Sequence, residues 1–191
     1  MAESLVPKYL APRVVETPRL VLRPFTLADH AGYARITADP DVMRYMGAGN
    51  PYTPDLAWRA MAAVLGHWEL LGYGLWAVTL REGGALIGHA GFLDPYGWPG
   101  FELGYMLDRP YWGRGYAQEA TQAALDVAWN TLHKSRVISL IRPANAASAK
   151  LAVRLGAVRE GSVELMGSEA DVYAHARGAA GGTRERIQSV T

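Results

Sequence analysis

The stretch that decides the fold reads Arg109-Pro110-Tyr111-Trp112-Gly113-Arg114-Gly115-Tyr116-Ala117. A strand-like run at 101–108 leads into it, and a strongly helical run at 116–132 leads out of it. Gly113 and Gly115 lack a Cβ, so the turn can take left-handed backbone angles and another molecule can approach it closely. The first amide N–H groups of the helix have no intrahelical partners, and with the helix dipole they favour phosphate oxygens. The stretch therefore predicts either a phosphate site, to which Arg114 adds a cation, or a tight turn without a ligand.

The two glycines do not match the common nucleotide-binding loops. No Gly-Lys-Ser/Thr follows them, as it would in a Walker loop, and the third glycine of a dinucleotide fingerprint is absent. The preceding strand also comes late in the chain, after a hairpin. A nucleotide-binding domain is therefore a third-ranked interpretation.

The composition describes an ordinary globular domain and excludes several kinds of chemistry. The 191 residues suffice for one domain with a core, and half of them are apolar. The absence of cysteine excludes disulfides, cysteine-ligated metal and a cysteine nucleophile. A net charge of +1 from 19 basic and 18 acidic side chains gives no sign of a nucleic-acid surface. No apolar run approaches the roughly 20 residues of a membrane helix, and no signal pattern opens the sequence, so we expect a cytoplasmic protein. We also expect no metal.

The first part of the chain predicts an arm, a strand and two helices. Residues 1–17 contain two prolines and no clear period, so we expect a loosely attached arm. The alternating segment 19–25 predicts a strand, and Thr26 with Asp29 in a capping-box position begins a helix that runs to about residue 37. Thr53-Pro54 begins a second helix, through Leu71. Its aromatic and apolar side chains recur at helical spacing and predict a face packed on the sheet: Trp58, Met61, Leu65 and Trp68.

The rest of the chain predicts a mixed sheet with one parallel step. Expected strands are 74–81, 85–94, 101–108, 136–141, 158–165 and 171–176, with helices at 116–132 and from Asn145 to Leu155. The crossover from 101–108 through a helix to 136–141 is long enough for a parallel pair. We therefore predict an α/β (α+β) fold with a mostly antiparallel central sheet, one splayed parallel pair and helices on both faces. A single domain at 18–177 and a flexible tail at 178–191 complete the prediction.

Five segments carry a resemblance to a known family: ETPRLVLRPF, LIGHAGF, FELGYMLD, YWGRGYAQEA and NAASAKLAVRLGA. In this order they resemble the GNAT superfamily of N-acetyltransferases, and in particular its branch of ribosomal-protein alanine N-acetyltransferases. The resemblance covers about 16–177. It implies the GNAT fold, acetyl-CoA as co-substrate and a primary amine, either a protein N-terminus or a small molecule, as acceptor.

The resemblance also implies cofactor-binding residues. The family signature Gln/Arg-x-x-Gly-x-Gly/Ala falls on Pro110, Gly113 and Gly115, so the amides of 112–117 are expected to cradle the pyrophosphate. The family's Asn-x-x-Ser falls on Asn145 and Ser148. The backbone of 106–107 is expected to pair with the pantetheine arm. The implied set is Met106, Leu107, Trp112, Gly113, Arg114, Gly115, Tyr116, Ala117, Asn145 and Ser148.

Acetyl transfer to an amine needs a base and a proton donor, and three residues are candidates for these catalytic roles. An amine titrates at about 8–10, so a base or a water relay must take its proton near neutral pH. Glu102 is the first candidate base, and a solvated carboxylate at a strand start is its plain alternative. His89 is the second, although a lone strand histidine is more often structural. Ser148 is the candidate donor to the thiolate, or else an ordinary first-turn helix residue.

Four further questions stay open in the sequence: the role of three cations, catalysis itself, the acceptor and the oligomeric state. Arg114, Arg142 and Lys150 are cations that either meet phosphates or are solvated surface charges. The alternative to an enzyme is a non-catalytic CoA-binding module of the same fold. The acceptor is expected to be held by the least patterned loops, 43–54 and 95–100. Its identity and the oligomeric state, a homodimer included, are not encoded in any motif.

Overall fold

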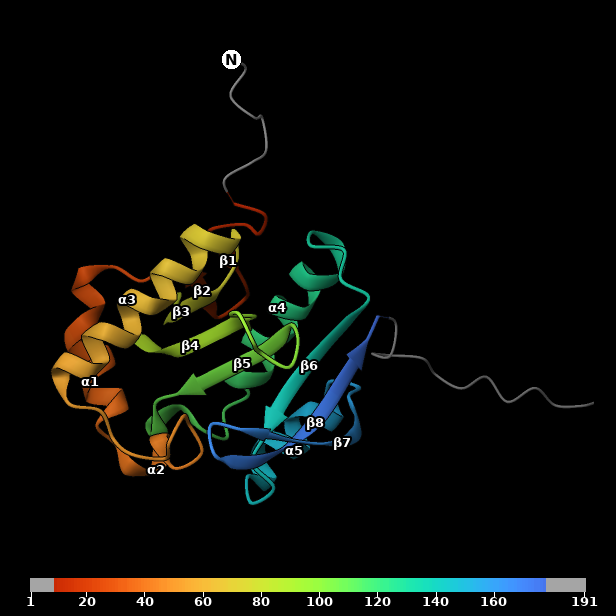
Figure 1. Ribbon diagram of the computed structural model, residues 1–191. Coiled ribbons are helices and arrows are strands. Elements are labelled where there is room, and N and C mark those ends of the chain that lie inside the picture. Colours follow the sequence, from red (N-terminus) through yellow and green to blue (C-terminus); the bar gives the residue numbers. More distant parts are fainter. Residues whose placement is uncertain (1–8, 178–191) are drawn as a thin grey trace, which may run out of the picture.

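The computed structural model describes residues 9–177, which form one eight-stranded sheet in the order β1-β2-β3-β4-β5-β6-β8-β7 (Figure 1). The strands are β1 (Val15–Glu16), β2 (Leu20–Arg23), β3 (Leu75–Leu80), β4 (Leu86–Leu93), β5 (Glu102–Leu107), β6 (Arg136–Ile141), β7 (Val158–Leu165) and β8 (Ser168–Ala176). Every neighbouring pair is antiparallel except β5–β6. This confirms the predicted mixed, mostly antiparallel sheet.

Helices cover both faces of the sheet. They are α1 (His30–Thr37), α2 (Pro40–Met43), α3 (Pro54–Leu71), α4 (Tyr116–Asn130) and α5 (Ala146–Arg154). In Figure 1, α1 and α3 lie in front of the sheet, and α4 and α5 lie behind it. Most of the helix ends follow from local signals in the sequence. For example, Thr26 and Asp29 form the expected capping box on the 3-10 turn before α1, and Gly72 at φ 74° ends α3.

The segment before β2 differs from the predicted loose arm. Of the residues that the structure describes there, Leu10 and Ala11 donate their amides to the carbonyl of Gly72, at 2.8 and 3.0 Å. The indole of Trp76 donates to the carbonyl of Pro12 at 3.1 Å, and β1 pairs with β2. The prediction of an arm is therefore wrong for 9–17, because tertiary partners that no local period reveals hold this backbone. Residues 1–8 and the predicted tail, 178–191, lie outside the described residues.

The aromatic face of α3 is narrower than the sequence suggests. Its buried stripe consists of Ala57, Met61, Val64 and Trp68. Trp58 is 50% exposed, so the prediction that it packs on the sheet is wrong. At 100° per residue, the four buried residues span about 60° of the helix circumference, and Trp58 stands about 60° beyond the edge of that stripe.

The parallel pair splays as predicted, and side chains mark where it opens. β5 and β6 share one paired position, Glu102 with Ile138, and the amide of Ile138 donates to the carbonyl of Phe101 at 2.9 Å. One step further, the hydroxyl of Ser139 donates to the carbonyl of Leu103 at 3.1 Å, in place of a backbone donor. Beyond this point the strands diverge and leave a gap toward their carboxyl ends.

Candidate active site

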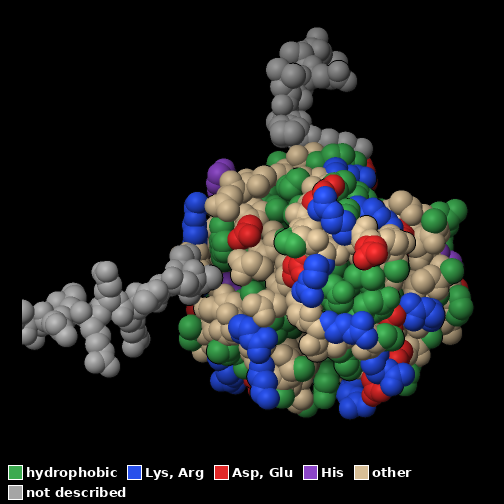
Figure 2. Space-filling model, turned by 180° about the vertical axis from the view of Figure 1, so that it is seen from behind, with side chains coloured by type: hydrophobic (Ala, Val, Ile, Leu, Met, Phe, Trp, Pro, Cys, Tyr) green, Lys and Arg blue, Asp and Glu red, His purple; other side chains and the backbone are tan. Residues whose placement is uncertain are grey.

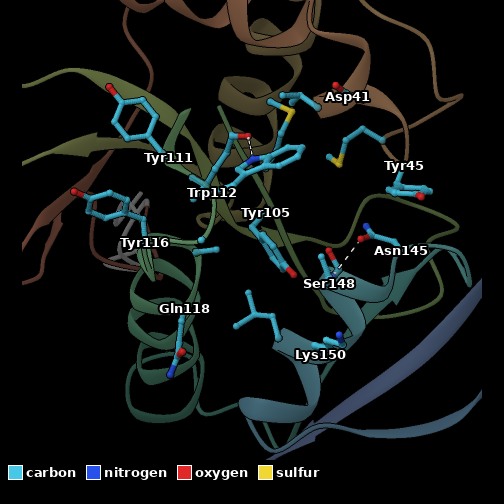
Figure 3. A pocket seen from close by; sticks show the side chains of 18 of the residues that line it. Asp41, Tyr45, Tyr105, Tyr111, Trp112, Tyr116, Gln118, Asn145, Ser148 and Lys150 are labelled. Atoms are coloured by element: carbon cyan, nitrogen blue, oxygen red, sulfur yellow. Dashed lines mark hydrogen bonds between the residues drawn. The ribbon is translucent and has the colours of Figure 1, made fainter. Parts of the chain in front are cut away.

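A cavity of about 490 Å³ lies at the open end of the β5–β6 pair (Figure 3). Its walls come from α2 and the residues after it, the end of β5, the glycine turn, and the first turns of α4 and α5. The protein surface seen in Figure 2, from behind the view of Figure 1, carries apolar side chains with Lys and Arg around them. Arg44, Lys150 and Arg154 are cationic residues that line the cavity. The cavity therefore combines apolar walls with positive charge at its borders.

The glycine turn has the geometry that the sequence predicts. Gly113 has φ 70° and Gly115 has φ 78°, both in the left-handed region that disfavours side chains. Gly115 is the N-cap of α4, and the next three residues, 116–118, line the cavity. The unpartnered amides at the start of α4 therefore lie at the cavity wall, where an anion can accept from them.

A partly buried acidic contact holds the glycine turn, and sequence reasoning missed it. Glu119, in the first turn of α4, accepts from Arg19 Nε at 2.6 Å and from Thr17 Oγ1 at 2.6 Å. Arg19 also donates to the carbonyl of Arg114 at 2.9 Å and lies over the ring of Tyr116, 4.4 Å from its centroid. Burial raises the pKa of Glu119, but the hydrogen bonds from Thr17 and Arg19 outweigh it and hold the pKa below its usual value. The Glu119 carboxylate therefore stays charged, and the guanidinium of Arg19 offsets the negative charge that would otherwise repel phosphate at this helix end.

The three cations named from the sequence separate in the structure. Lys150 lines the cavity, whereas Arg114 is not among the lining residues. Arg142 donates to three carbonyls, those of Gly47 (3.1 Å), Leu165 (3.1 Å) and Glu169 (3.2 Å). Arg142 therefore joins the loop after α2 to the β7–β8 hairpin, and the expectation of a phosphate contact or a solvated charge is wrong for it.

The backbone of β5 offers an unpaired edge inside the sheet. The amide of Asp108 donates to Ile87 of the β4 side, so by alternation Met106 also turns its backbone groups toward β4. Tyr105 and Leu107 turn theirs toward the gap left by β6. Met106 contributes its side chain to the cavity instead, and the carbonyl of Leu107 accepts from Trp112 Nε1 at 2.7 Å. The edge that can pair with an extended ligand is thus 105 and 107, where the sequence pointed to 106 and 107.

The start of α5 brings two predicted residues to the cavity. Asn145 is the N-cap, and its Oδ1 accepts from the amide of Ser148 at 3.2 Å. Both residues line the cavity, and Figure 3 shows the Tyr105 ring pointing from β5 toward Ser148. The Asn-x-x-Ser spacing thus places an amide and a hydroxyl beside the free strand edge.

Glu102 lies at the closed end of the pair and does not line the cavity. It is 8% exposed, and its Oε2 accepts from Trp98 Nε1 at 2.7 Å. Burial raises the pKa of Glu102 to about 7, against the opposing effects of the Trp98 hydrogen bond and the Leu140 amide. A carboxyl with this pKa exchanges a proton near neutral pH, which is the property of a general base.

His89 is also absent from the cavity lining. It is buried on β4, its Nδ1 lies 3.4 Å from the hydroxyl of Tyr33, and burial lowers its pKa to about 4. At neutral pH its imidazole is uncharged and faces α1. This environment matches the structural alternative that the sequence offered for His89.

Two properties of residues 9–177 bear on other functions. The described residues contain no helix that is both long and apolar enough to cross a bilayer. Within the same part of the chain, no group of three or more His, Asp or Glu side chains is arranged to hold a metal ion.

Comparisons with known proteins agree with this architecture. The family model of the acetyltransferase (GNAT) domain matches residues 19–158. An uncharacterised N-acetyltransferase of Bacillus licheniformis, p20, is 31% identical over 164 residues, which are 82% of this chain and 91% of that protein. An acetyltransferase structure from Agrobacterium tumefaciens aligns with a TM-score of 0.76 at 32% identity, over 92% of this chain and 99% of that one.

A third relative shows the fold alone. A ribosomal α-N-protein acetyltransferase, solved in complex with coenzyme A, aligns with a TM-score of 0.72 at 15% identity, over 85% of this chain and 97% of that one. The family model covers most of the chain. The chain therefore belongs to the GNAT family and is an N-acetyltransferase, since acetyl transfer is the reaction of that family.

Proposed function

We propose that the protein transfers an acetyl group from acetyl-CoA to a primary amine, on a protein N-terminus or a small molecule, by direct attack in a ternary complex. The observation that carries the proposal is one cavity that joins a left-handed glycine turn at a helix start to a free strand edge. This arrangement suits a ligand with a phosphate group at one end and an extended amide-bearing arm at the other. The coenzyme A complex of the 15%-identical relative supports the same ligand class.

The residues at the cavity fit acetyl-CoA in two ways. Gly113 and Gly115 have left-handed backbone angles that residues with a Cβ rarely adopt. The amides of 112–117 supply donors for a pyrophosphate. The outward backbone groups of Tyr105 and the amide of Leu107 can pair with the pantetheine amides as an added strand would, since the carbonyl of Leu107 already accepts from Trp112. Asn145 and Ser148 stand beside that edge, where the thioester sulfur is expected.

For the base we propose Glu102, with a water molecule as relay. The reason for the relay is position, because Glu102 does not reach the cavity lining. The reason for Glu102 is its pKa of about 7, which lets it take the amine proton near neutral pH. His89, whose pKa is about 4, is mostly unprotonated but a weak base at that pH, so it ranks second.

For the proton donor we propose Ser148. Its hydroxyl lies at the start of α5 beside the free edge of β5, and its backbone is held by the Asn145 cap. The amine forms the new C–N bond, the C–S bond breaks, and the sulfur takes the Ser148 proton. The proton that the amine gave to Glu102 returns through water to the serine oxygen, which restores both residues.

The acceptor side of the cavity is formed by the residues after α2. Tyr45 and Met46 line it, and Arg142 fixes the neighbouring Gly47. This supports the loop 43–54 as part of the acceptor site. Residues 95–100 do not line the cavity, and their link to the proposed site is the hydrogen bond that Trp98 donates to Glu102.

The test is turnover with acetyl-CoA on a panel of amines that contains peptides with free N-termini, polyamines and amino acids, scored by release of free thiol. Thiol release that requires one class of amine supports the proposal and names the acceptor. Calorimetric binding of acetyl-CoA without thiol release on any amine would favour a CoA-binding module instead.

A further inference from the structure

The hydroxyl of Tyr105 is a buried donor without a partner. Among the residues that the structure describes, two buried side-chain polar atoms lack a hydrogen bond, and they are Tyr105 Oη and His175 Nδ1. His175 is away from the cavity, whereas Tyr105 lines it. An unsatisfied buried hydroxyl destabilises a fold, so it is kept mainly where it has a use.

The surroundings of Tyr105 point to Ser148. Figure 3 shows the phenol directed from the open part of β5 toward Ser148 on α5. Burial raises the pKa of Tyr105, and the nearby Ser148 hydroxyl lowers it in part, yet no hydrogen bond of ordinary geometry joins the two groups. The phenol therefore stays protonated at neutral pH, and a small rearrangement would let it donate to the Ser148 hydroxyl.

A serine hydroxyl needs such a partner if it is to donate in one direction. Its single proton rotates among three staggered positions, and its oxygen has two lone pairs. The Ser148 amide is fixed by Asn145, so the backbone is set, and the rotation of the side chain and of its hydroxyl proton remains free. A donor that occupies one lone pair from the β5 side leaves that proton to point into the cavity.

We propose that Tyr105 is a positioning residue for Ser148: when acetyl-CoA fills the cavity, the phenol donates to Ser148 Oγ and directs the serine proton at the thioester sulfur. The inference rests on the proposed function, in which Ser148 protonates the departing thiolate. As the C–S bond breaks, the sulfur takes the serine proton, and Tyr105 keeps its own. The proton that the amine gave to Glu102 returns through water to the serine oxygen, so after one cycle only the substrates have changed.

This role and a purely structural one predict different rates for Tyr105→Phe. Removing an unsatisfied buried hydroxyl leaves stability unchanged or raises it. A positioning role adds a loss in the chemical step, roughly tenfold for one hydrogen bond, with acetyl-CoA affinity nearly unchanged. Tyr73→Phe is the matched control, because the Tyr73 hydroxyl is partly buried too but donates to Asp94 at 3.3 Å, away from the cavity. It should lose a little stability and keep the wild-type rate.

The experiment is a double-mutant cycle with Tyr105→Phe and Ser148→Ala. Single-turnover rates, calorimetric dissociation constants for acetyl-CoA and melting temperatures are measured on all four proteins. We expect the double variant to be no slower than Ser148→Ala alone, since Tyr105 acts only through the serine. A wild-type rate in Tyr105→Phe, or losses that multiply in the double variant, would overturn the positioning role. If the wild-type protein itself releases no thiol on any amine, the proposed function fails and this inference fails with it.

Discussion

The two ends of the β5–β6 pair differ in what lies between the strands. At the closed end, side chains of the protein bridge the strands: Ser139 donates to the carbonyl of Leu103, and Glu102 is held by Trp98 and influenced by the Leu140 amide. At the open end, the outward backbone of Tyr105 and the first amides of α4 face a cavity. The comparison teaches that a splayed strand pair can hold a buried carboxyl with a raised pKa at one end and an unpaired backbone edge at the other. The predictions below separate the two ends.

The largest effect is expected from Glu102→Gln at the closed end. If Glu102 is the base, its loss lowers turnover by roughly 10²–10⁴-fold while acetyl-CoA affinity stays nearly unchanged. In the wild-type protein, the rate should rise with pH through about 7, where the carboxyl loses its proton. Steady-state kinetics across pH 5–9 on both proteins provide the measurement.

The control for this prediction is Glu164→Gln, an exposed glutamate on β7 that should leave the profile as it is. Trp98→Phe sharpens the test further. It removes a donor that favours the charged carboxylate, so the midpoint of the rate profile should move to higher pH. A Glu102→Gln profile that keeps its height and shape assigns the proton transfer to water or to His89.

Glu102 should also make the stability of the protein depend on pH. The carboxyl titrates at about 7 when folded and at 4.5 as its reference value, so between these limits the unfolded chain releases a proton that the folded chain retains. The free energy of unfolding therefore falls by about 3 kcal/mol as pH rises through this window. Burial lowers the pKa of His89 to about 4, which gives an opposite trend below about 6.5.

The difference between wild type and Glu102→Gln isolates the carboxyl, because His89 is common to both. Urea unfolding at pH 4.5, 5.5, 6.5 and 7.5 should show the variant gaining on the wild type at each step until about pH 7. A constant difference over that range would mean that the carboxyl titrates normally in the fold.

Gly115→Val tests the glycine turn at the open end of the β5–β6 pair. A β-branched residue at φ 78° is strained, and its Cβ would lie 3.3 Å from Arg19 Nη2. We expect acetyl-CoA affinity to fall by roughly ten- to a hundredfold, since the amides at the start of α4 shift with the turn. Calorimetry on the folded variant measures this.

Gly83→Val is the matched control for backbone strain. Gly83 has a similar φ, 75°, in the turn between β3 and β4, and the space that its Cβ would enter is open. It should lose stability but keep its acetyl-CoA affinity. Equal affinities in the Gly115 variant and in the wild type would remove the phosphate site from the glycine turn.

Asn145→Ala tests the smallest effect. Loss of the cap should destabilise the protein by ~1 kcal/mol, or roughly 2–4 °C in Tm, and weaken acetyl-CoA binding. Ser148→Ala keeps the cap, because the capped group is the Ser148 amide, so its Tm should change little. Thermal unfolding of both variants distinguishes the cap from the hydroxyl. A Tm loss confined to Ser148→Ala would contradict the assignment.

The sequence predicts the features that adjacent residues determine. The segments 136–141 and 158–165 are predicted as strands and are β6 and β7, since β-branched residues and alternation mark them locally. The left-handed glycines and the Asn145 cap are likewise local. The prediction for the early segment 9–17 is wrong because its order depends on Gly72 and Trp76, far along the chain.

Within the site, the contacts between distant segments are out of reach of the sequence. Alternation along 101–108 places Tyr105 opposite in face to Glu102, but no pattern says that Ser148 lies before its hydroxyl. The hydrogen bond from Trp98 to Glu102 and the three carbonyls around Arg142 also join separate elements. Such contacts depend on how the helices pack, and a single sequence carries no periodic signal for them.

The ion pair between Arg19 and Glu119 links the start of the fold to the glycine turn across 100 positions of sequence. Because ligand binding at the turn and docking of the segment before β2 use the same contact, each favours the other by linkage. Bound acetyl-CoA should therefore slow amide hydrogen exchange at 17–20, which reach the cavity wall through Glu119 and through the contacts of Arg19 with Arg114 and Tyr116. A fragment that begins after β2 would retain every glycine of the motif and still lose the support that shapes it.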